Sequence, residues 1–270
     1  MENRILSDIP PFRLHRGIWF AGSSKVSVHI IATEQGLVML DTGYPDMYEQ
    51  ILSSMACLGL DPKDICAIFL THGHIDHFGC VREFQALSGA KTYISRIDQQ
   101  ILRGEKDLSW AHELGYPRLP PFSCDVSLED GDCFSFGSTR IRCVLTPGHT
   151  DGTMSFFISS GEGPERITAA MHGGTGFNSM KTQYLKRYGL SLACREAFLE
   201  GLRKVSNEPV DLVLGNHPGQ NDTKGKLAQV QAGAETVLDP TEWRRFLLRT
   251  EADFLAYFQA EANATTSHGI

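Results

Sequence analysis

Four potential metal ligands lie within six consecutive positions of this chain. Residues 71 to 79 have the sequence Thr-His-Gly-His-Ile-Asp-His-Phe-Gly, which places His72, His74, Asp76 and His77 close together. Imidazole nitrogens and carboxylate oxygens are ligands that zinc prefers, and ordinary packing cannot satisfy four such groups at this spacing. We therefore interpret the stretch as part of a metal site, and not as a polar loop that happens to be rich in histidine.

The segment before this motif must position the side chains of the motif. Residues 65 to 70 form an apolar run that predicts a buried strand, so the motif should lie in a loop at the strand's C-terminal end. If the strand geometry continues, alternation places His72 and His74 on one side, where both can bind one ion. Asp76 and His77 lie further on, where the chain must turn, and can reach a second ion. One motif would then supply about half of the ligands of a two-metal site.

Small residues surround the motif. Gly73 and Gly79 would relieve crowding where the backbone passes close to a metal or to another loop. Cys80, three residues after His77, is expected to pack under the site as a free thiol instead of binding a metal. The chain has seven cysteines and no C-x-x-C pair, so neither a zinc ribbon nor a complete disulfide framework is predicted.

Two later segments continue the pattern of a histidine after a strand. Thr-Pro-Gly-His-Thr at 146 to 150 follows an apolar strand at 140 to 145, and Asn-His-Pro at 216 to 218 follows a last strand at 211 to 214. Together with His-x-His-x-Asp-His, these segments resemble the metallo-β-lactamase-fold hydrolases over about 17 to 217. The resemblance implies an α/β protein with a four-layer αββα sandwich of the metallo-β-lactamase type.

The resemblance also implies how the ligands are divided. In one lactamase subclass of the family, three histidines bind the first metal, Asp-His-His binds the second, and only water bridges them. This chain can fill both sets, with His72, His74 and His149 on one ion and Asp76, His77 and His217 on the other. Two zinc ions per chain are therefore expected, with iron or manganese as the alternatives.

Three further polar residues are candidates for a role near the metals. Many family members end the strand before His172 with a metal-bridging aspartate, but residues 167 to 177 contain no aspartate. His172 is then either a replacement ligand or a supporting or substrate-side group, or else the site needs no bridging side chain because water alone bridges the metals. The subclass pattern favours the last of these interpretations. Asp41 would lie behind the metals and steady the ligand loop, or else is only a turn residue after a strand. Asn216 is a candidate for a similar supporting or substrate-side role.

Such a site predicts hydrolysis of a carbonyl or related ester bond. Two zinc ions can share a water and lower its pKa towards neutrality, so that a zinc-bridging hydroxide attacks the substrate while Asp76 receives its proton. The chain has no G-x-S-x-G motif to offer a serine nucleophile. The expected substrate is a β-lactam, lactone, ester or thioester. The alternatives are an oxidoreductase-like member of the same fold and a non-catalytic, metal-stabilised binding protein.

Composition narrows the class of protein further. The chain has 270 residues, of which 41% are hydrophobic and 21% charged, as in soluble globular proteins with a sizeable core. Its formal charge of −7 argues against sequence-independent nucleic-acid binding. The N-terminal segment lacks the apolar core of a signal peptide, and no stretch is apolar for long enough to span a membrane. We expect a cytoplasmic monomer or homodimer with a small-molecule substrate and neither nucleic-acid nor membrane partners.

The remaining pattern predicts one α/β domain over residues 1 to 270. Strands are predicted at 26–32, 37–40, 65–70, 91–94, 126–128, 133–136, 140–145, 152–158, 166–170 and 211–214, and helices at 46–58, 81–87, 181–205, 224–234 and about 240–260. Asp46 and the pair at 221 to 222 are expected helix caps. Residues 110 to 122, rich in proline and aromatic residues, predict a loop near the cleft. A disordered tail is expected at about 261 to 270, where His268 is not a site candidate.

Overall fold

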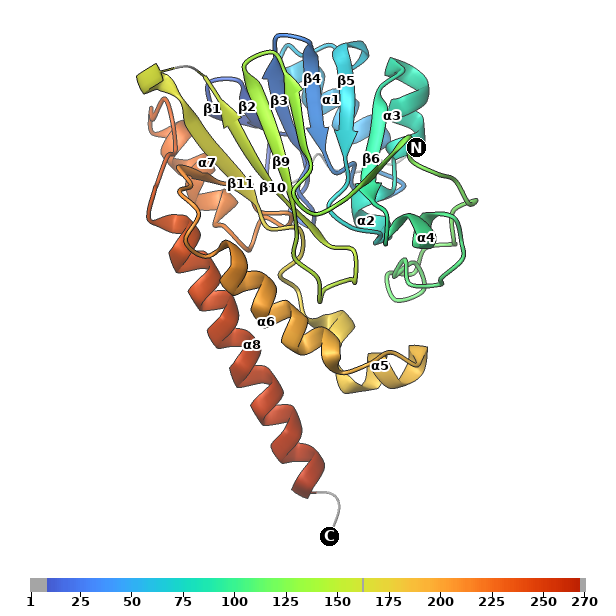
Figure 1. Ribbon diagram of the computed structural model, residues 1–270. Helices are drawn as coiled ribbons and strands as arrows, with labels where there is room; N and C mark the ends of the chain where they lie inside the picture. The colour runs from blue at the N-terminus through green and yellow to red at the C-terminus, as the bar shows by residue number, and fades with distance from the viewer. Residues whose placement is uncertain (1–8, 162, 268–270) are drawn as a thin grey trace.

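The computed structural model describes residues 9–161 and 163–267, and in this part of the chain two β-sheets lie face to face (Figure 1). The first sheet contains, in spatial order, β1 (Phe12–His15), β2 (Ile18–Phe20), β3 (His29–Thr33), β4 (Gly36–Leu40), β5 (Ile65–Phe69), β6 (Lys91–Ser95) and β7 (Val126–Leu128). The second contains β12 (Leu212–Val213), β11 (Ile167–Met171), β10 (Met154–Ser160), β9 (Thr139–Leu145) and β8 (Cys133–Phe136).

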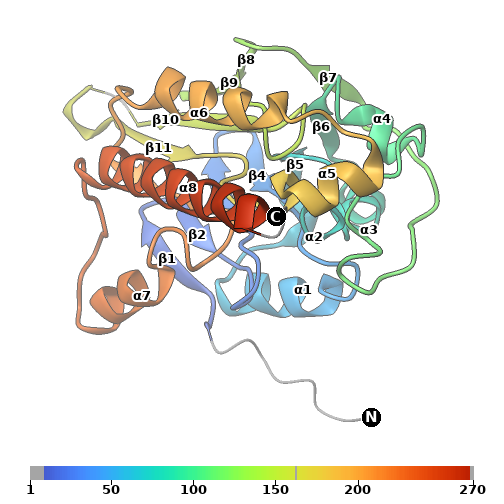
Figure 2. The same cartoon turned by 90° about the horizontal axis from the view of Figure 1, so that it is seen from below.

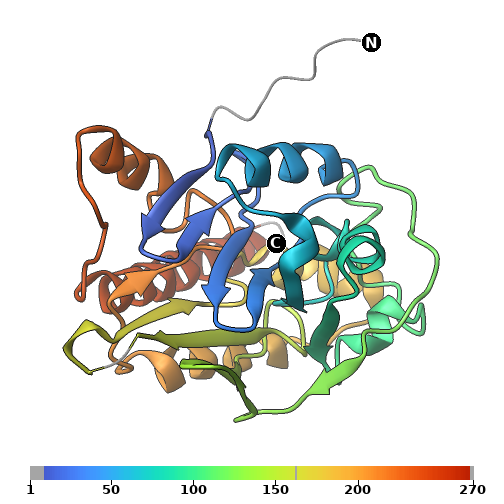
Figure 3. The same cartoon turned by 90° about the horizontal axis from the view of Figure 1, so that it is seen from above.

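Helices cover the outer faces of both sheets and connect their strands. The α-helices are α1 (Tyr48–Cys57), α2 (Ile75–Phe78), α3 (Val81–Ser88), α4 (Gln99–Leu102), α5 (Thr182–Tyr188), α6 (Ala193–Val205), α7 (Thr223–Gln231) and α8 (Glu242–Ser267). Short 3₁₀ helices are η1 (Pro62–Asp64), η2 (Gly163–Glu165) and η3 (Asn178–Met180). Helices α1 and α3 lie outside the first sheet, and α6 and α8 lie outside the second (Figures 2 and 3).

Alternating side chains make both faces of each sheet apolar. In β5, Ala67 and Phe69 point into the core between the sheets, whereas Ile68 joins the core under α1 and α3. In β10, Phe156 points into the central core and Phe157 packs with α6 and α8. A strand that buries both faces is apolar at consecutive positions, which is why these strands appear in the sequence as continuous apolar runs. The predicted four-layer αββα sandwich is confirmed.

Two expectations about helix ends are wrong. The helix predicted over 181 to 205 is divided into α5 and α6, because Gly189 adopts the left-handed backbone conformation (φ 63°) and ends α5. Asp46 does not cap α1, since Met47 occupies the N-cap position and makes no side-chain cap. Asp222 does cap α7 as predicted, accepting a hydrogen bond of 3.2 Å from the backbone N–H of Gly225.

Helix α8 is longer than the sequence predicts. It extends to Ser267, so the helix end expected near 260 and the disorder expected for 261 to 267 are both wrong. Glu261 accounts for the extension, because its carboxylate lies 2.7 Å from the guanidinium of Arg195 and accepts hydrogen bonds from Thr182. The last part of the expected tail, 268 to 270, lies outside the described residues. Neither α8 nor another helix within 9–161 and 163–267 has the length and apolar character needed to cross a membrane.

Candidate metal centre

The C-terminal ends of several strands meet at one edge of the sandwich. Strands β4 and β5 are parallel, β11 and β12 are parallel, and β9 runs in the direction of β11 because both are antiparallel to β10. The polar residues singled out in the sequence follow these ends: Asp41 after β4, His72 to His77 after β5, His149 after β9, His172 after β11, and Asn216 and His217 after β12.

His72, His74 and His149 form a first group of donor atoms. Nε2 of His72 lies 3.1 Å from Nδ1 of His74 and 3.1 Å from Nε2 of His149. All three ligand atoms lie within 4.8 Å of one another, as they must to share one ion. Strand β5 ends at Phe69, so the convergence of His72 and His74 comes from the bend that follows the strand and not from strand alternation.

Asp76, His77 and His217 form a second group. Asp76 and His77 lie in α2, a single helical turn, and His217 reaches them from the loop after β12. Nε2 of His77 lies 3.3 Å from Nε2 of His217 and 3.5 Å from Oδ2 of Asp76. The two groups are adjacent, because the ring centroids of His72 and His77 are 4.2 Å apart.

The outer ring nitrogens determine where the histidine protons lie. Nδ1 of His149 and Nδ1 of His217 face backbone carbonyl oxygens at 2.5 and 2.7 Å, and Nδ1 of His77 faces a carboxylate oxygen of Asp41 at 2.8 Å. These oxygens are acceptors, so each Nδ1 carries the proton and each inward Nε2 presents a lone pair. Converging lone pairs repel one another unless a cation lies between them, so the arrangement fits bound metal ions.

The electrostatic environment keeps most of these histidines neutral. Burial lowers the pKa of four of them and neighbouring imidazoles lower it further, namely His72, His74, His149 and His217. For His149 the pKa falls to about 4. Burial also acts to lower the pKa of His77, but the carboxylates of Asp76 and Asp41 outweigh it and raise this pKa above its ordinary value. A neutral imidazole is the form that binds a metal.

Asp41 is hydrogen-bonded to His77 of the second group and to Thr71, the residue that precedes His72 of the first group. The Thr71 hydroxyl and His77 Nδ1 each donate to its Oδ2 at 2.8 Å, and the Thr71 backbone N–H donates to its Oδ1 at 2.8 Å. Because the Thr71 proton goes to Asp41, the Thr71 oxygen can accept the proton of His72 Nδ1 at 3.0 Å. One carboxylate therefore orients a histidine in each group, one directly and one through a threonine. Asp41 has a left-handed backbone (φ 56°), a conformation in which aspartate is enriched.

A model of one protein family matches this arrangement of motifs. The family described as the metallo-beta-lactamase superfamily matches residues 21–162, which is more than half of the chain. The chain belongs to the metallo-beta-lactamase superfamily. The solved structure of BJP-1, a subclass B3 metallo-beta-lactamase of Bradyrhizobium japonicum, superposes with a TM-score of 0.83. The superposition covers 97% of this chain and 98% of that chain at 24% sequence identity, and it shows a shared fold.

Curated members of the superfamily that resemble the chain include hydrolases. Hydroxyacylglutathione hydrolase of Gloeobacter violaceus is 35% identical over 110 residues, which are 40% of this chain and 35% of that protein. A probable polyketide biosynthesis zinc-dependent hydrolase of Bacillus subtilis is 33% identical over 98 residues, 36% of each protein. The matches cover much less than two thirds of these relatives, so they support the superfamily and the hydrolase class but no particular substrate.

His172 and Asn216 are buried beside the site but belong to neither donor group. Nδ1 of His172 accepts a hydrogen bond of 3.3 Å from the backbone N–H of Gly174, and burial lowers its pKa to about 3. The amide of Asn216 donates to the carbonyl oxygen of Gly173 at 2.8 Å and so joins the loops after β11 and β12. Among the described residues, Nε2 of His172 and Oδ1 of Asn216 find no partner. Cys80 also lies outside both groups, with its thiol directed at the Tyr44 carbonyl oxygen, 2.9 Å away.

Asp98 is a site residue that the sequence analysis missed. Its buried carboxylate accepts hydrogen bonds from the Thr150 hydroxyl (2.7 Å) and from the backbone N–H groups of Gly73 (2.8 Å) and Gly152 (3.0 Å). It thereby joins the two loops that contain the first donor group. Burial raises the pKa of Asp98 to about 6, although these hydrogen bonds act in the opposite direction. Asp98 lies just before the short helix α4, and its position in the sequence carries no motif that could have identified it.

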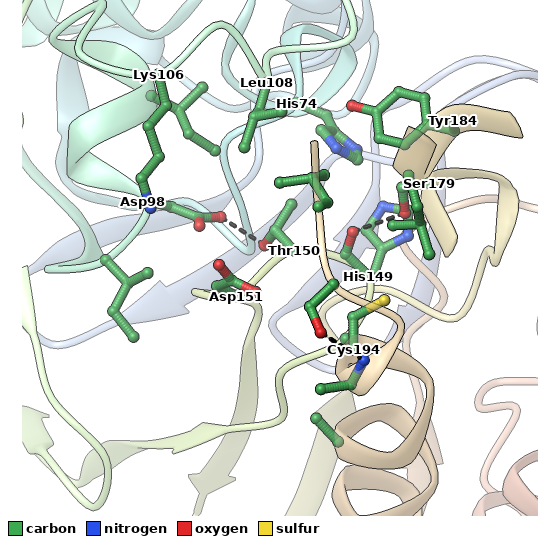
Figure 4. Close-up of a pocket in the computed structure, with 18 residues that line it drawn as sticks. His74, Asp98, Lys106, Leu108, His149, Thr150, Asp151, Ser179, Tyr184 and Cys194 are labelled. Atoms are coloured by element: carbon green, nitrogen blue, oxygen red, sulfur yellow. Dashed lines mark hydrogen bonds between the residues drawn. The ribbon is translucent and has the colours of Figure 1, made fainter. Parts of the chain in front are cut away.

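A cavity of about 260 Å³ opens beside the first donor group (Figure 4). His74 and His149 form part of its wall, so a ligand in the cavity would reach the proposed metal site. The loop predicted to pack near the cleft does so through Trp110, whose ring centroid lies 5.6 Å from that of His74 and 5.4 Å from that of Tyr184. The cavity itself was not predictable, because its wall comes from segments far apart in the sequence.

Proposed function

We propose that the protein is a dinuclear zinc hydrolase that cleaves a carbonyl substrate such as a β-lactam, lactone, ester or thioester. The observation that supports this best is the convergence of six donor atoms in two adjacent groups, with the protons of His77, His149 and His217 on the outside and their lone pairs inside. Membership of a superfamily with hydrolase relatives, one of them described as zinc-dependent, supports the same conclusion.

The six donor residues and Asp41 would each have a distinct role in the reaction. One ion would be held by His72, His74 and His149, and the other by Asp76, His77 and His217. Two zinc ions bound there would lower the pKa of a shared water and polarise the carbonyl oxygen of the substrate. Asp76 would orient the attacking water and take up its proton, since a carboxylate can use one oxygen for a metal and the other for a proton. Asp41 would keep the rings of His72 and His77 in the orientation that directs Nε2 inwards.

The first test combines metal analysis with hydrolysis. Purified protein would be assayed for zinc, iron and manganese, and for turnover of a chromogenic β-lactam, a lactone and a thioester, with and without a chelator. We expect about two zinc ions per chain and turnover of at least one substrate that the chelator abolishes. His149→Ala should remove most of this activity, whereas His112→Ala, an exposed histidine outside both groups, should not.

Other outcomes would replace this proposal with one of its alternatives. Bound iron together with substrate-dependent oxygen consumption would indicate an oxidoreductase. Two firmly bound metal ions without turnover of any of the three substrate classes would indicate a metal-stabilised binding protein. Full activity in the absence of any bound metal would contradict the zinc site itself.

A further inference from the structure

The cavity beside the first donor group has a largely apolar wall. It lies between the segment around α4, the loop that follows it, and the helices α5 and α6 (Figure 4). Its apolar lining includes Ile97, Ile101, Leu108, Leu185, Leu190 and Ala197. Apolar surface of this kind gains free energy when a ligand removes it from water, in proportion to the area covered.

Several polar side chains of the wall are already hydrogen-bonded within the protein, among them Asp98, Ser179 and Ser191. Asp98 accepts from Thr150 at 2.7 Å. The hydroxyl of Ser179 donates to the carbonyl oxygen of His149 at 2.7 Å, and Ser191 accepts a backbone N–H at 3.1 Å. Groups that are satisfied in this way do not need a polar ligand, and they lose little when an apolar one displaces water from the cavity.

The wall also contains two exposed charged side chains of opposite sign. Lys106 and Asp151 both line the cavity and are exposed to solvent. The third charged residue of the lining, Asp98, is buried and already accepts hydrogen bonds. Opposite charges at the rim give no net preference for a cationic or an anionic ligand. The cavity therefore favours a neutral, apolar group.

We propose that this cavity binds the apolar acyl chain of the substrate. The inference rests on the proposed function, because His74 and His149 belong both to the cavity wall and to the first donor group, so a chain in the cavity is continuous with a carbonyl at the donor groups. The substrate class is then an ester, thioester or lactone whose apolar acyl chain fits a cavity of about 260 Å³. Water adds its oxygen to the acyl carbon, the C–O or C–S bond breaks, and the leaving alcohol or thiol takes the second proton.

A series of thioesters with one leaving group and acyl chains from acetyl to decanoyl tests this assignment. Each methylene transferred from water to an apolar wall contributes about 0.8 kcal/mol, so kcat/KM should rise about fourfold per methylene until the cavity is full. A profile that is flat from acetyl to decanoyl, in protein that hydrolyses the acetyl thioester, would overturn the assignment of the cavity and leave the hydrolase proposal intact.

Two variants of α6 separate the cavity from the rest of the enzyme. Ala197→Leu adds a larger side chain to the wall and should lower the ratio of kcat/KM for octanoyl over acetyl thioester by tenfold or more. Glu200→Leu places the same side chain on the same helix at an exposed position outside the cavity, and should leave this ratio and the acetyl rate unchanged. Equal ratios in the wild type and Ala197→Leu would contradict the proposal.

Binding of the product acid gives a readout that does not depend on turnover. Isothermal titration calorimetry should show octanoate binding at least tenfold more tightly than acetate in the wild type and Glu200→Leu, and this difference should disappear in Ala197→Leu. If no β-lactam, lactone or thioester is hydrolysed but this pattern of binding holds, the hydrolase proposal fails and the apolar subsite stands. If octanoate binds no better than acetate, the subsite fails whatever the activity.

Discussion

Nδ1 of His77 lies 2.8 Å from Oδ2 of Asp41, and both side chains are fully buried. The same carboxylate accepts the Thr71 hydroxyl proton, and the Thr71 oxygen in turn faces His72 Nδ1 at 3.0 Å. A residue outside both donor groups thus sets the ring orientation of one histidine in each. Asp41 occupies this position because β4 and β5 are parallel neighbours, which brings the residue after β4 under the loop after β5.

Asp41→Asn should weaken zinc binding by 10- to 100-fold, the range seen when hydrogen bonds to metal-binding histidines are lost. In asparagine one carboxylate oxygen becomes an NH₂ donor, so the side chain cannot accept from both the Thr71 backbone N–H and His77 Nδ1, which donate to different oxygens of Asp41. Zinc affinity would be measured by competition with a chromophoric chelator. Asp64→Asn, an exposed site distant in the fold, is the matched control. Unchanged affinity in Asp41→Asn would show that the carboxylate of Asp41 is not needed to hold the metal.

His217→Ala and His172→Asn should differ in metal content. His217 belongs to the second donor group, so its removal should reduce zinc from two ions per chain to about one. His172 belongs to neither group, so His172→Asn should retain both ions. Metal analysis after dialysis, with circular dichroism to verify folding, gives the comparison. Loss of one zinc ion from His172→Asn would show that His172 is a metal ligand, in the place where many family members have a bridging aspartate.

Gly79→Ala should destabilise the protein by about 1–3 kcal/mol or more, the usual cost of overpacking. A Cβ at this position would lie 2.4 Å from backbone atoms of Tyr44 and Pro45, and backbone cannot move aside as a flexible side chain would. The expected crowding of Gly79 against another loop is therefore observed. Gly219→Ala, where a Cβ meets nothing within 4 Å, should change the free energy of unfolding little. Urea denaturation of both variants gives the difference; equal stability would contradict the close approach at Gly79.

Asp239 should stabilise the start of α8 in a pH-dependent way. Its carboxylate accepts hydrogen bonds from Thr241 and Arg245, which lower its pKa to about 2. A carboxyl group whose folded pKa is below its unfolded value of about 3.9 contributes its full stabilisation above that value and loses it as the pH falls towards 2. The stability difference between the wild type and Asp239→Asn should therefore be constant from pH 7 to 5 and shrink below pH 4. Urea denaturation of the metal-stripped proteins would measure it; a difference that grows on acidification would have the wrong sign.

The sequence identified the six candidate ligands because they lie in short motifs of residues suited to zinc, and each motif follows a strand-like apolar run. Those motifs are local, and they also carried the family resemblance that implied the fold and the division of ligands into two sets. Most strands could also be predicted from local sequence, because strands buried on both faces are apolar at consecutive positions. What stays a prediction is that the two groups bind zinc.

Helix ends and supporting residues were harder to predict, because they depend on contacts between distant segments. Asp98 acts on loops that follow β5 and β9, and Glu261 extends α8 through Arg195 on α6. No spacing in the sequence reports such contacts. Gly189 was visible, but a glycine inside an amphipathic pattern ends a helix only if its backbone turns left-handed, and that is decided by the packing of α5 and α6.

The sequence by itself therefore determined the chemistry available to this protein, since side-chain types and their order after the strands are properties of the chain. Only the tertiary structure decided how that chemistry is arranged. It brought His149 to within 3.1 Å of His72 and His217 to within 3.3 Å of His77, placed Asp41 against both groups, and left an apolar cavity beside His74. The reason is physical: distances between residues far apart in the chain are set by how two sheets pack, and that packing depends on the whole core at once.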